Sequence, residues 1–343
     1  HRAHTLPTAY CKGITIMKLS IIIPNYNGLR FLRKCLSSLA QQTFSDFEIV
    51  IVDNGSSDGS IDFITKHCPE VRLLALPQNT GFSKAANIGI RSSNTPYIML
   101  LNNDTALAPD CIEHLMHCIE NVPYAFSAGA RIVKASSSGL IDTGGDYYNI
   151  FGYAFCRGQG LKTDTLPDRI YPVFTNCACA VIYRRSLLEK TGLFDERFFA
   201  YLEDVDIGFR ARRLGLSNVH CPNAYVYHVG SGTTSAKYTA FKVFHSAKNN
   251  ILLCQKNLTF LQKFLHLPAQ TAGTILKYLF FRRRGLGAAY VSGCFAGLRT
   301  AICTPAPKRT FKQSFSSFVR TEPWLVQSSF FYIAQYVSRH LPC

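Results

Sequence analysis

The chain has 343 residues, of which 47% are hydrophobic and 13% aromatic, so it can bury one large core or two smaller ones. This composition excludes an intrinsically disordered protein. The formal net charge is +16, but 11 of these charges come from residues 255–343, where twelve basic residues accompany a single acid, Glu322. Because the excess charge is concentrated in this tail, we expect no nucleic-acid partner.

The 13 cysteines show no spacing that would hold zinc, and only Cys177 and Cys179 are near neighbours. We interpret them as reduced thiols of a cytosolic protein. Residues 1–16 lack an apolar stretch of signal-peptide length, and strand character begins after Met17. We therefore expect residues 1–16 to be an extension outside the fold, with Met17 as a candidate natural start.

Four short apolar runs alternate with helical patterns after residue 18. The runs cover residues 19–24, 47–52, 71–76 and 97–101, and helical patterns follow at residues 29–39 and 83–91. Continuous apolar strands that alternate with helices predict an α/β fold, in which a mostly parallel sheet has helices on both faces.

Each of these strands is followed by polar residues. They are Asn25 to Asn27, Asp53, Asn79, and Asn102 to Asp104. Ligands of such sheets bind at the carboxyl ends of the strands, so we expect these side chains to share one site. The carboxylate of Asp104 and the two amides before it suit a magnesium-class ion that bridges phosphates. The alternative is an Asn/Asp turn that follows a strand.

Residues 136–172 are rich in glycine and aromatic residues. This composition is typical of a mobile lid or acceptor loop over an active site. An ordinary hairpin insertion would explain it equally well.

Three carboxylates, Glu203, Asp204 and Asp206, stand where an aromatic loop turns into a helix. The backbone N–H groups and the dipole of a first helical turn favour the ionised form of an acid, which is what a general base requires. We therefore predict Asp204 as a general base. The alternative is that these acids cap the helix and pair with Arg210 and Arg212.

The tail after about residue 240 combines amphipathic and basic segments. Residues 258–267 and 274–281 are amphipathic, Arg282, Arg283 and Arg284 follow, and residues 285–298 form an apolar stretch of 14 residues. This stretch is shorter than the roughly 20 residues of a spanning helix. We expect helices that lie on an anionic membrane surface, the alternative being a helical cap with a solvated basic face.

Together these motifs resemble one known family. They are Ile22-Ile23-Pro24-Asn25-Tyr26-Asn27-Gly28, then Val52-Asp53-Asn54-Gly55-Ser56-Ser57-Asp58, then Asn79-x-Gly81-Phe82 through Asn87-x-Gly89, then Leu100-Leu101-Asn102-Asn103-Asp104, then Phe198-Phe199-x-Tyr201-x-Glu203-Asp204-x-Asp206. Their order over residues 19–235 resembles the family 2 glycosyltransferases of the GT-A fold, and is most similar to the bacterial rhamnosyltransferase-like branch.

The resemblance implies a nucleotide-sugar site. Pro24, Tyr26 and Asn27 would line the nucleotide base, and Asp53 would hydrogen-bond the pyrimidine or ribose. The donor pocket would be lined by Asn79, Gly81 and Asn87. Lys84 would either reach a phosphate or be a solvated lysine on the helix surface.

The resemblance also implies the metal and the base. Asp104, with Asn102 as the weaker partner, would stand for the family's Asp-x-Asp motif and hold Mg²⁺ or Mn²⁺. His228 aligns with a histidine that approaches the metal or the diphosphate, although a histidine at a strand end can also be a hydrogen-bonded structural residue. Asp204 would be the base and Glu203 its neighbour.

The implied activity is inverting transfer of a sugar, such as rhamnose, from a dTDP- or UDP-sugar to a saccharide or lipid-linked acceptor of a cell-surface polysaccharide. A catalytically inactive sugar-nucleotide-binding or scaffold protein, or a nucleotidyltransferase, is the alternative. We expect a catalytic domain at residues 17–240 and a helical, basic region at 241–343. The protein would be cytoplasmic and peripheral on the inner face of the cell membrane.

Overall fold

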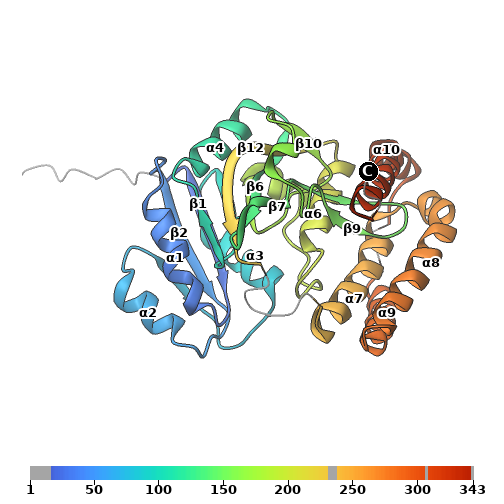
Figure 1. Ribbon diagram of the computed structural model, residues 1–343, viewed down its shortest axis with the longest axis horizontal. Helices are drawn as coiled ribbons and strands as arrows, with labels where there is room; N and C mark the ends of the chain where they lie inside the picture. Colours follow the sequence, from blue (N-terminus) through green and yellow to red (C-terminus); the bar gives the residue numbers. More distant parts are fainter. Residues whose placement is uncertain (1–16, 231–237, 306–307, 341–343) are drawn as a thin grey trace, which may run out of the picture.

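The computed structural model describes residues 17–230, 238–305 and 308–340. Ten strands form one sheet, in which eight follow the order β10-β12-β6-β11-β4-β1-β2-β3, while β5 pairs with β12 and β7 with β6 (Figure 1). The strands of this sheet are β1 (Leu19–Asn25), β2 (Phe47–Asp53), β3 (Arg72–Ala75), β4 (Tyr97–Leu101), β5 (Thr105–Leu107), β6 (Ala125–Lys134), β7 (Ser137–Thr143), β10 (Tyr171–Val173), β11 (Ala180–Arg184) and β12 (Ser217–His228). A separate hairpin pairs β8 (Asp146–Tyr148) with β9 (Ala154–Cys156).

The helices surround this sheet and extend the chain beyond it. They are α1 (Leu29–Ala40), α2 (Ser60–His67), α3 (Phe82–Ser92), α4 (Cys111–Asn121), α5 (Arg185–Thr191), α6 (Glu203–Arg213), α7 (Ala240–Asn257), α8 (Phe260–Arg282), α9 (Gly287–Cys303) and α10 (Phe311–His340), with a 3₁₀ turn, η1, at Thr163–Thr165.

The predicted parallel sheet is confirmed in its first half. Strand β1 runs parallel to β2 and β4, and β2 runs parallel to β3. Beyond β4 the sheet is mixed, because β11 is antiparallel to both β4 and β6, and β10 is antiparallel to β12. Alternate residues of β1 point to opposite faces, with Ile21 packed in the core under α1, α2 and α4 and Ile22 in the core under α3, α5 and α6. Helices therefore cover both faces, as predicted.

The segment 136–172 is a packed hairpin region. Strand β7 extends the main sheet, and the β8–β9 hairpin buries Tyr147 and Tyr148 in a third core with Phe209. Leu252 and Leu253 of α7 lie in this same core. The elements on either side of the predicted boundary at residue 240 thus share buried surface, and independent folding of the two regions stays a prediction.

The C-terminal helices α7 to α10 lie beside the sheet (Figure 1). The two amphipathic segments predicted at 258–267 and 274–281 form one helix, α8, which contains Pro268. Helix α9 crosses α7 closely, since a Cβ on Gly293 would lie 2.4 Å from the carbonyl oxygen of Phe244 and one on Gly297 would lie 2.6 Å from that of Lys248. Among the helices of the described ranges, none is both long and apolar enough to cross a membrane. All the cysteines in these ranges have free thiols.

Candidate active site

A chain of hydrogen bonds ties the carboxyl ends of β4, β1 and β2 together. The side-chain amide of Asn103 donates to Asn25 Oδ1 (2.6 Å), and Asn25 Nδ2 donates to Asp53 Oδ2 (2.7 Å). The other Asp53 oxygen accepts from the backbone N–H of Ser56 (2.8 Å). Gly28 makes this approach possible, because a Cβ there would lie 2.0 Å from Asn103 Nδ2. The predicted polar edge therefore exists, and a contact of Asp53 with a nucleotide stays a prediction.

The turn after β1 presents Tyr26 at the rim of this edge. Tyr26 is 38% exposed, whereas Pro24 is only partly exposed within the strand. Asn27 has a left-handed backbone (φ 49°), and its side-chain oxygen accepts from the N–H of Ser57 (2.8 Å). The exposed ring of Tyr26 can stack on a flat ligand such as a nucleotide base.

Asn79 and Gly81 lie in the loop between β3 and α3. This loop contacts both the end of β2 and the aromatic loop in front of α6. Asn54 Nδ2 donates to Asn79 Oδ1 (3.0 Å), which also accepts from the N–H of Gly81 (2.9 Å). Gly81 has φ 87°, and a Cβ there would lie 2.5 Å from the carbonyl oxygen of Phe199. Only glycine fits both this backbone conformation and this contact.

Asn87 is placed differently from its prediction as a donor-pocket residue. It is 1% exposed, its amide donates to Phe194 O (2.8 Å) and Glu196 Oε1 (3.0 Å), and its oxygen accepts from Phe194 N (3.0 Å). Its polar atoms therefore face the protein, where they hold the loop between α5 and α6. Lys84 on the same helix is exposed.

Asp104 and His228 face each other across neighbouring strands. His228 ends β12 opposite Thr105 of β5, and its Nε2 lies 3.3 Å from Asp104 Oδ1. Its Nδ1 lies 2.7 Å from Asp142 Oδ2. This carboxylate orients the imidazole so that Nε2 points at Asp104. A carboxylate and an imidazole oriented in this way are a donor pair that fits a divalent ion such as Mn²⁺.

The charge around His228 follows from the same contacts. Burial by itself lowers the pKa of an imidazole, but the contacts of His228 raise its pKa on balance. Burial raises the pKa of the neighbouring Cys179 thiol, which keeps that thiol neutral. We therefore attribute the raised pKa of His228 to the carboxylates of Asp104 and Asp142.

Asp204 lies in the first turn of α6, as predicted, within a group of buried acids. Its carboxylate accepts from the N–H of Val205 (2.8 Å) and of Ala178 (3.4 Å). One ligand atom each of Asp204, Asp146 and Cys177 lie within 4.8 Å of one another. The alternative prediction, that the first-turn acids pair with arginine, is correct for Asp206. Its carboxylate contacts Arg210 Nε at 2.9 Å.

Burial and mutual repulsion shift the pKa values of these acids. Burial raises the pKa of Asp204. Burial and the charge of Asp204 raise the pKa of Asp146 to about 7 and that of Glu203 to about 8. Near neutral pH, Glu203 therefore keeps its proton, and Asp204 is the carboxylate suited to accept one.

The segment Cys177–Cys179 connects Asp204 to the Asp104–His228 pair. Ala178 N–H points at Asp204, the carbonyl oxygen of Cys179 accepts from the N–H of Asn102 (2.9 Å), and the Cys179 thiol contacts His228. Asn102 and Asp204 belong to motifs about 100 positions apart in the sequence. Both therefore contact the same short segment. Asp142 and Asp146 were missed; their only sequence signal is a pair of aspartates around Thr143-Gly144-Gly145 in a segment read as a lid or hairpin.

Comparisons with known proteins identify the family of the chain. The family model described as "Glycosyl transferase family 2" matches residues 20–192, half of the 343 residues. The N-acetylglucosaminyl-diphospho-decaprenol L-rhamnosyltransferase of Mycobacterium tuberculosis is 26% identical over 262 residues, which cover 70% of this chain and 85% of the relative. Glycosyltransferase GlyA of Streptococcus pneumoniae is 26% identical over 229 residues, 65% of this chain and 32% of the relative.

Two solved structures share the fold. GalNAc-T7 with UDP, GalNAc and Mn²⁺ aligns with a TM-score of 0.56 and 15% identity over 70% of this chain and 48% of that chain. The mannosyltransferase PcManGT from Pyrobaculum calidifontis, in complex with GDP-Man and Mn²⁺, aligns with a TM-score of 0.54 and 12% identity over 96% and 89%. At these identities the likeness shows the GT-A fold alone. With the family model covering half of the residues, the chain belongs to the family 2 glycosyl transferases.

Proposed function

We propose that this glycosyltransferase moves a sugar from a nucleotide-diphosphate donor to a hydroxyl group of a saccharide or lipid-linked saccharide, with inversion at the anomeric carbon. The observation that carries the proposal is the single segment, Cys177–Cys179, which contacts both Asp204 and His228. The name of the mycobacterial relative supports rhamnose and a lipid-linked acceptor. A dTDP- or UDP-sugar is the proposed donor.

The carboxylate of Asp204 would accept the proton of the acceptor hydroxyl. The acceptor oxygen forms a bond to the anomeric carbon while the bond from that carbon to the diphosphate oxygen breaks, and the electron pair leaves with the diphosphate. A single displacement of this kind inverts the anomeric configuration. The protonated Glu203 next to Asp204 adds no competing negative charge near neutral pH.

Asp104 and His228 would hold Mg²⁺ or Mn²⁺, with Asn102 on the same loop as Asp104. His228 would have to give up its Nε2 proton, because only a neutral imidazole nitrogen coordinates a metal. When bound, such an ion neutralises the negative charge that develops on the departing diphosphate. Two protein ligands are a sufficient set, because the phosphates and water complete the coordination of these ions.

The experiment that tests this function is a product assay. The purified protein is incubated with dTDP-rhamnose, UDP-N-acetylglucosamine or UDP-glucose and a lipid-linked acceptor, and both the glycosylated lipid and the nucleoside diphosphate are measured. Equal amounts of the two products support transfer. Release of pyrophosphate from a nucleoside triphosphate and a sugar phosphate would instead identify a nucleotidyltransferase. Donor binding without either product would identify a binding protein.

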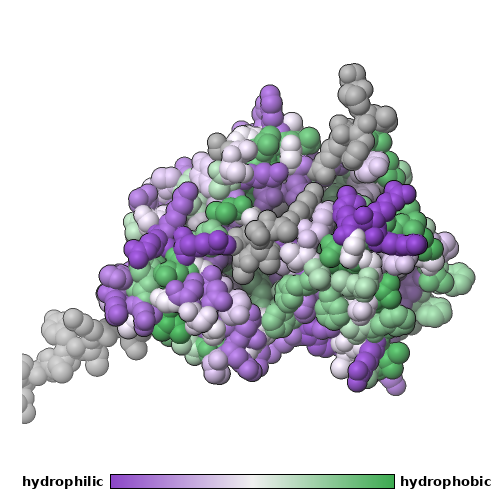
Figure 2. Space-filling model, turned by 60° about the horizontal axis from the view of Figure 1, so that its bottom comes forward, coloured by the Kyte–Doolittle hydropathy of each residue, from purple (hydrophilic) through white to green (hydrophobic). Residues whose placement is uncertain are grey.

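The C-terminal helices present an unusual surface. Their exposed large apolar side chains include Phe260, Leu261, Phe264, Leu265, Leu267, Ile275 and Leu276 on α8, Phe295, Leu298 and Ile302 on α9, and Phe311, Phe315 and Val319 on α10. Figure 2 shows hydrophobic residues gathered on the side of the molecule that these helices occupy. A soluble surface rarely carries so many large apolar side chains together.

The contact between α8 and α10 contains buried polar groups. Gln262 Nε2 donates to Thr321 Oγ1 (3.0 Å), and His266 Nε2 lies 2.8 Å from Glu322 Oε1. Gln262, His266 and Thr321 are all at most 5% exposed. These helices therefore bury polar groups while they expose many large apolar side chains, a combination that water alone does not favour.

We therefore propose that the exposed apolar surface of α8–α10 lies on an anionic membrane leaflet, which places the protein at the inner face of the cell membrane. The basic side chains at Arg282, Arg283, Arg284, Arg299, Lys308 and Lys312 are exposed, and the one acid of the region, Glu322, is half-buried. Each basic side chain near such a surface contributes roughly 1 kcal/mol to binding. The charge complements anionic lipid, and the apolar side chains would enter the interface.

A further inference from the structure

The turn directly before Glu203 and Asp204 has a strained backbone. Tyr201 has φ 74° and Leu202 has φ 67°, and neither residue is a glycine. Side chains other than glycine rarely adopt this left-handed conformation, because the Cβ approaches the backbone too closely. Such strain persists only where surrounding contacts hold it, and it occurs often at functional sites.

One side chain from α7 holds this turn. Asn249 is fully buried, and its Nδ2 donates to the carbonyl oxygens of Ala200 (2.8 Å) and Tyr201 (2.8 Å). An amide nitrogen has two N–H donors, so both are used on these two consecutive carbonyls. Buried backbone carbonyls need such partners, and Asn249 supplies them from a helix almost 50 residues away in sequence.

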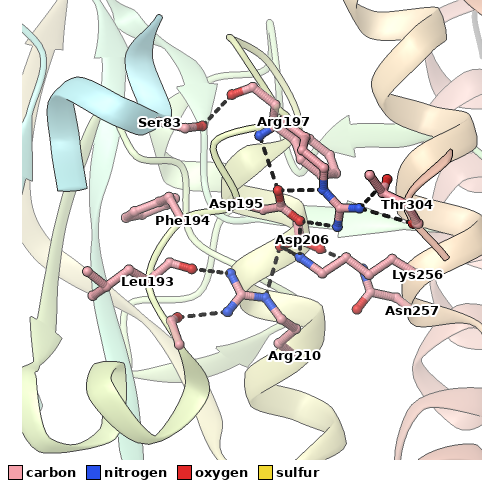
Figure 3. Close-up of polar contacts among 12 residues, drawn as sticks. Ser83, Leu193, Phe194, Asp195, Arg197, Asp206, Arg210, Lys256, Asn257 and Thr304 are labelled. Carbon is pink, nitrogen blue, oxygen red and sulfur yellow. Dashed lines mark hydrogen bonds and ion pairs between the residues drawn. The ribbon is translucent and has the colours of Figure 1, made fainter. Parts of the chain in front are cut away.

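The same helix binds both ends of the loop that contains the turn. Lys256 Nζ contacts Asp195 Oδ2 (2.7 Å) at the start of the loop and Asp206 Oδ2 (2.8 Å) in α6 after it, and Asn257 Nδ2 donates to Asp206 Oδ1 (2.7 Å). Figure 3 shows these contacts converging between the loop, α6 and α7. Asn249 and Lys256 are seven residues apart, so they lie on the same side of α7.

We infer that Asn249 is a positioning residue, which keeps the strained turn at Tyr201 and Leu202 in place and thereby fixes the direction of the Asp204 carboxylate. This inference rests on the proposed role of Asp204 as the base. Helix α7 acts as a clamp on the loop from Asp195 to Asp206. The side-chain amide of Asn249 binds the middle of the loop, and the ammonium group of Lys256 binds its two ends. The clamp lies outside residues 20–192, which the family model matches.

The first experiment compares Asn249→Ala with Asn250→Ala. Asn250 is the next residue on α7, and its side chain accepts from the hydroxyl of Tyr148 (3.0 Å) instead of holding the turn. We expect Asn249→Ala to lower kcat by about 10- to 100-fold, because small misplacements of a reacting group cost this much. The KM for the donor and the melting-temperature increase that the donor causes should stay close to wild type. Equal kcat values in the two variants would overturn the inference, as would a loss of donor binding in proportion to kcat.

A second experiment needs no substrate, so it separates failure of this inference from failure of the proposed function. Leu202→Gly should relieve the strain of the turn, because glycine adopts positive φ freely. The melting temperature is measured for Asn249→Ala in the wild-type and Leu202→Gly backgrounds. We expect the drop caused by Asn249→Ala to be at least halved in the glycine background. An equal drop, or a double variant that does not fold, would overturn the inference.

Discussion

At the scale of single residues, the most informative feature is a carboxylate whose neighbours are themselves acids. Asp204, Asp146 and Glu203 are all buried or half-buried, and burial raises the pKa of each of them. Buried carboxyl groups close to one another cannot all ionise, so their protons leave in separate steps. The chemistry of the site therefore depends on which member of the group is ionised.

Asp204→Asn removes the proposed base but keeps the shape of the side chain. We expect the transfer rate to fall by a factor on the order of 10²–10⁴, while donor binding is retained. Transfer is measured by product formation, and donor binding by the shift in melting temperature. A variant with near-normal turnover would exclude Asp204 as the base.

Asp146→Asn tests the electrostatic interaction between the carboxyl groups of Asp146 and Asp204. Because the pKa of Asp146 is raised to about 7, the wild-type kcat/KM should rise as the pH passes through 7, where the pair loses its last proton. The variant has no such proton, so this limb of the pH profile should move to lower pH, toward the ionisation of Asp204 alone. An unchanged limb would show that the two carboxyl groups do not interact.

Glu203→Gln tests the raised pKa of Glu203 through stability. The folded protein holds a proton on Glu203 up to about pH 8, whereas the unfolded chain releases it near pH 4.3. The free energy of unfolding of the wild type therefore falls as the pH rises between these values. At pH 8.5 the variant should be more stable than the wild type, with a smaller difference at pH 5 in urea unfolding. The same difference at both pH values would contradict this.

At the scale of elements, the proposed metal site is built from three separate parts of the chain. They are the end of β12, the end of β7 and the loop after β4. Asp142 on β7 holds the ring of His228 on β12, and this ring faces Asp104. The partners of a ligating histidine usually affect metal affinity almost as strongly as the ligands do.

The metal is tested by chelation and by two substitutions. EDTA should abolish transfer, and Asp104→Ala should remove metal-dependent donor binding. Asp142→Asn should weaken Mn²⁺ binding by about 10- to 100-fold while leaving the two proposed ligands in place. Isothermal titration with Mn²⁺ and UDP measures both variants. Full activity in excess EDTA would exclude a metal-dependent mechanism.

The sequence predicted these elements unevenly, for physical reasons. Strands β1 and β4 and the second half of β2 are buried on both faces, so they appear as mostly apolar runs that end in polar residues. The antiparallel insertion of β11 between β4 and β6 leaves no such pattern, because pairing depends on contacts far apart in sequence. Asp142 lies 86 residues from His228, and no pattern in a single sequence predicts that contact. A motif can likewise identify Asn87 without revealing that its side chain faces inward.

At the scale of the whole molecule, the proposed catalytic site and the proposed membrane-binding surface lie on connected elements. Many basic and apolar residues of α8–α10 are exposed, and α7 joins these helices to the cores beside α6. Replacing Arg282, Arg283 and Arg284 with Gln should lower co-sedimentation with vesicles that contain anionic lipid, because the electrostatic part of binding is lost. Transfer to a soluble acceptor analogue should be unchanged.

A control variant changes Lys66, Lys162 and Lys190 to Gln, which removes the same charge from exposed positions outside the C-terminal helices. It should bind vesicles like the wild type. High salt should weaken binding to anionic vesicles, since exposed charges are screened over about 8 Å at physiological ionic strength. Vesicle binding that ignores lipid charge would point to deeper apolar insertion. Self-association without vesicle binding would assign the apolar surface to a second copy of the chain.

The close crossing of α9 over α7 has a consequence for acceptor choice. Gly293 and Gly297 bring the two helix backbones into direct contact, and a crossing without intervening side chains has little room to slide. The apolar surface of α8–α10 therefore moves as one body with helix α7, which holds the loop before Asp204. Asp204 would then stand at a fixed height above the bilayer, and the enzyme would select acceptors by how far their hydroxyl projects from the membrane. Lengthening the headgroup by one sugar should reduce transfer more than lengthening the lipid chain does.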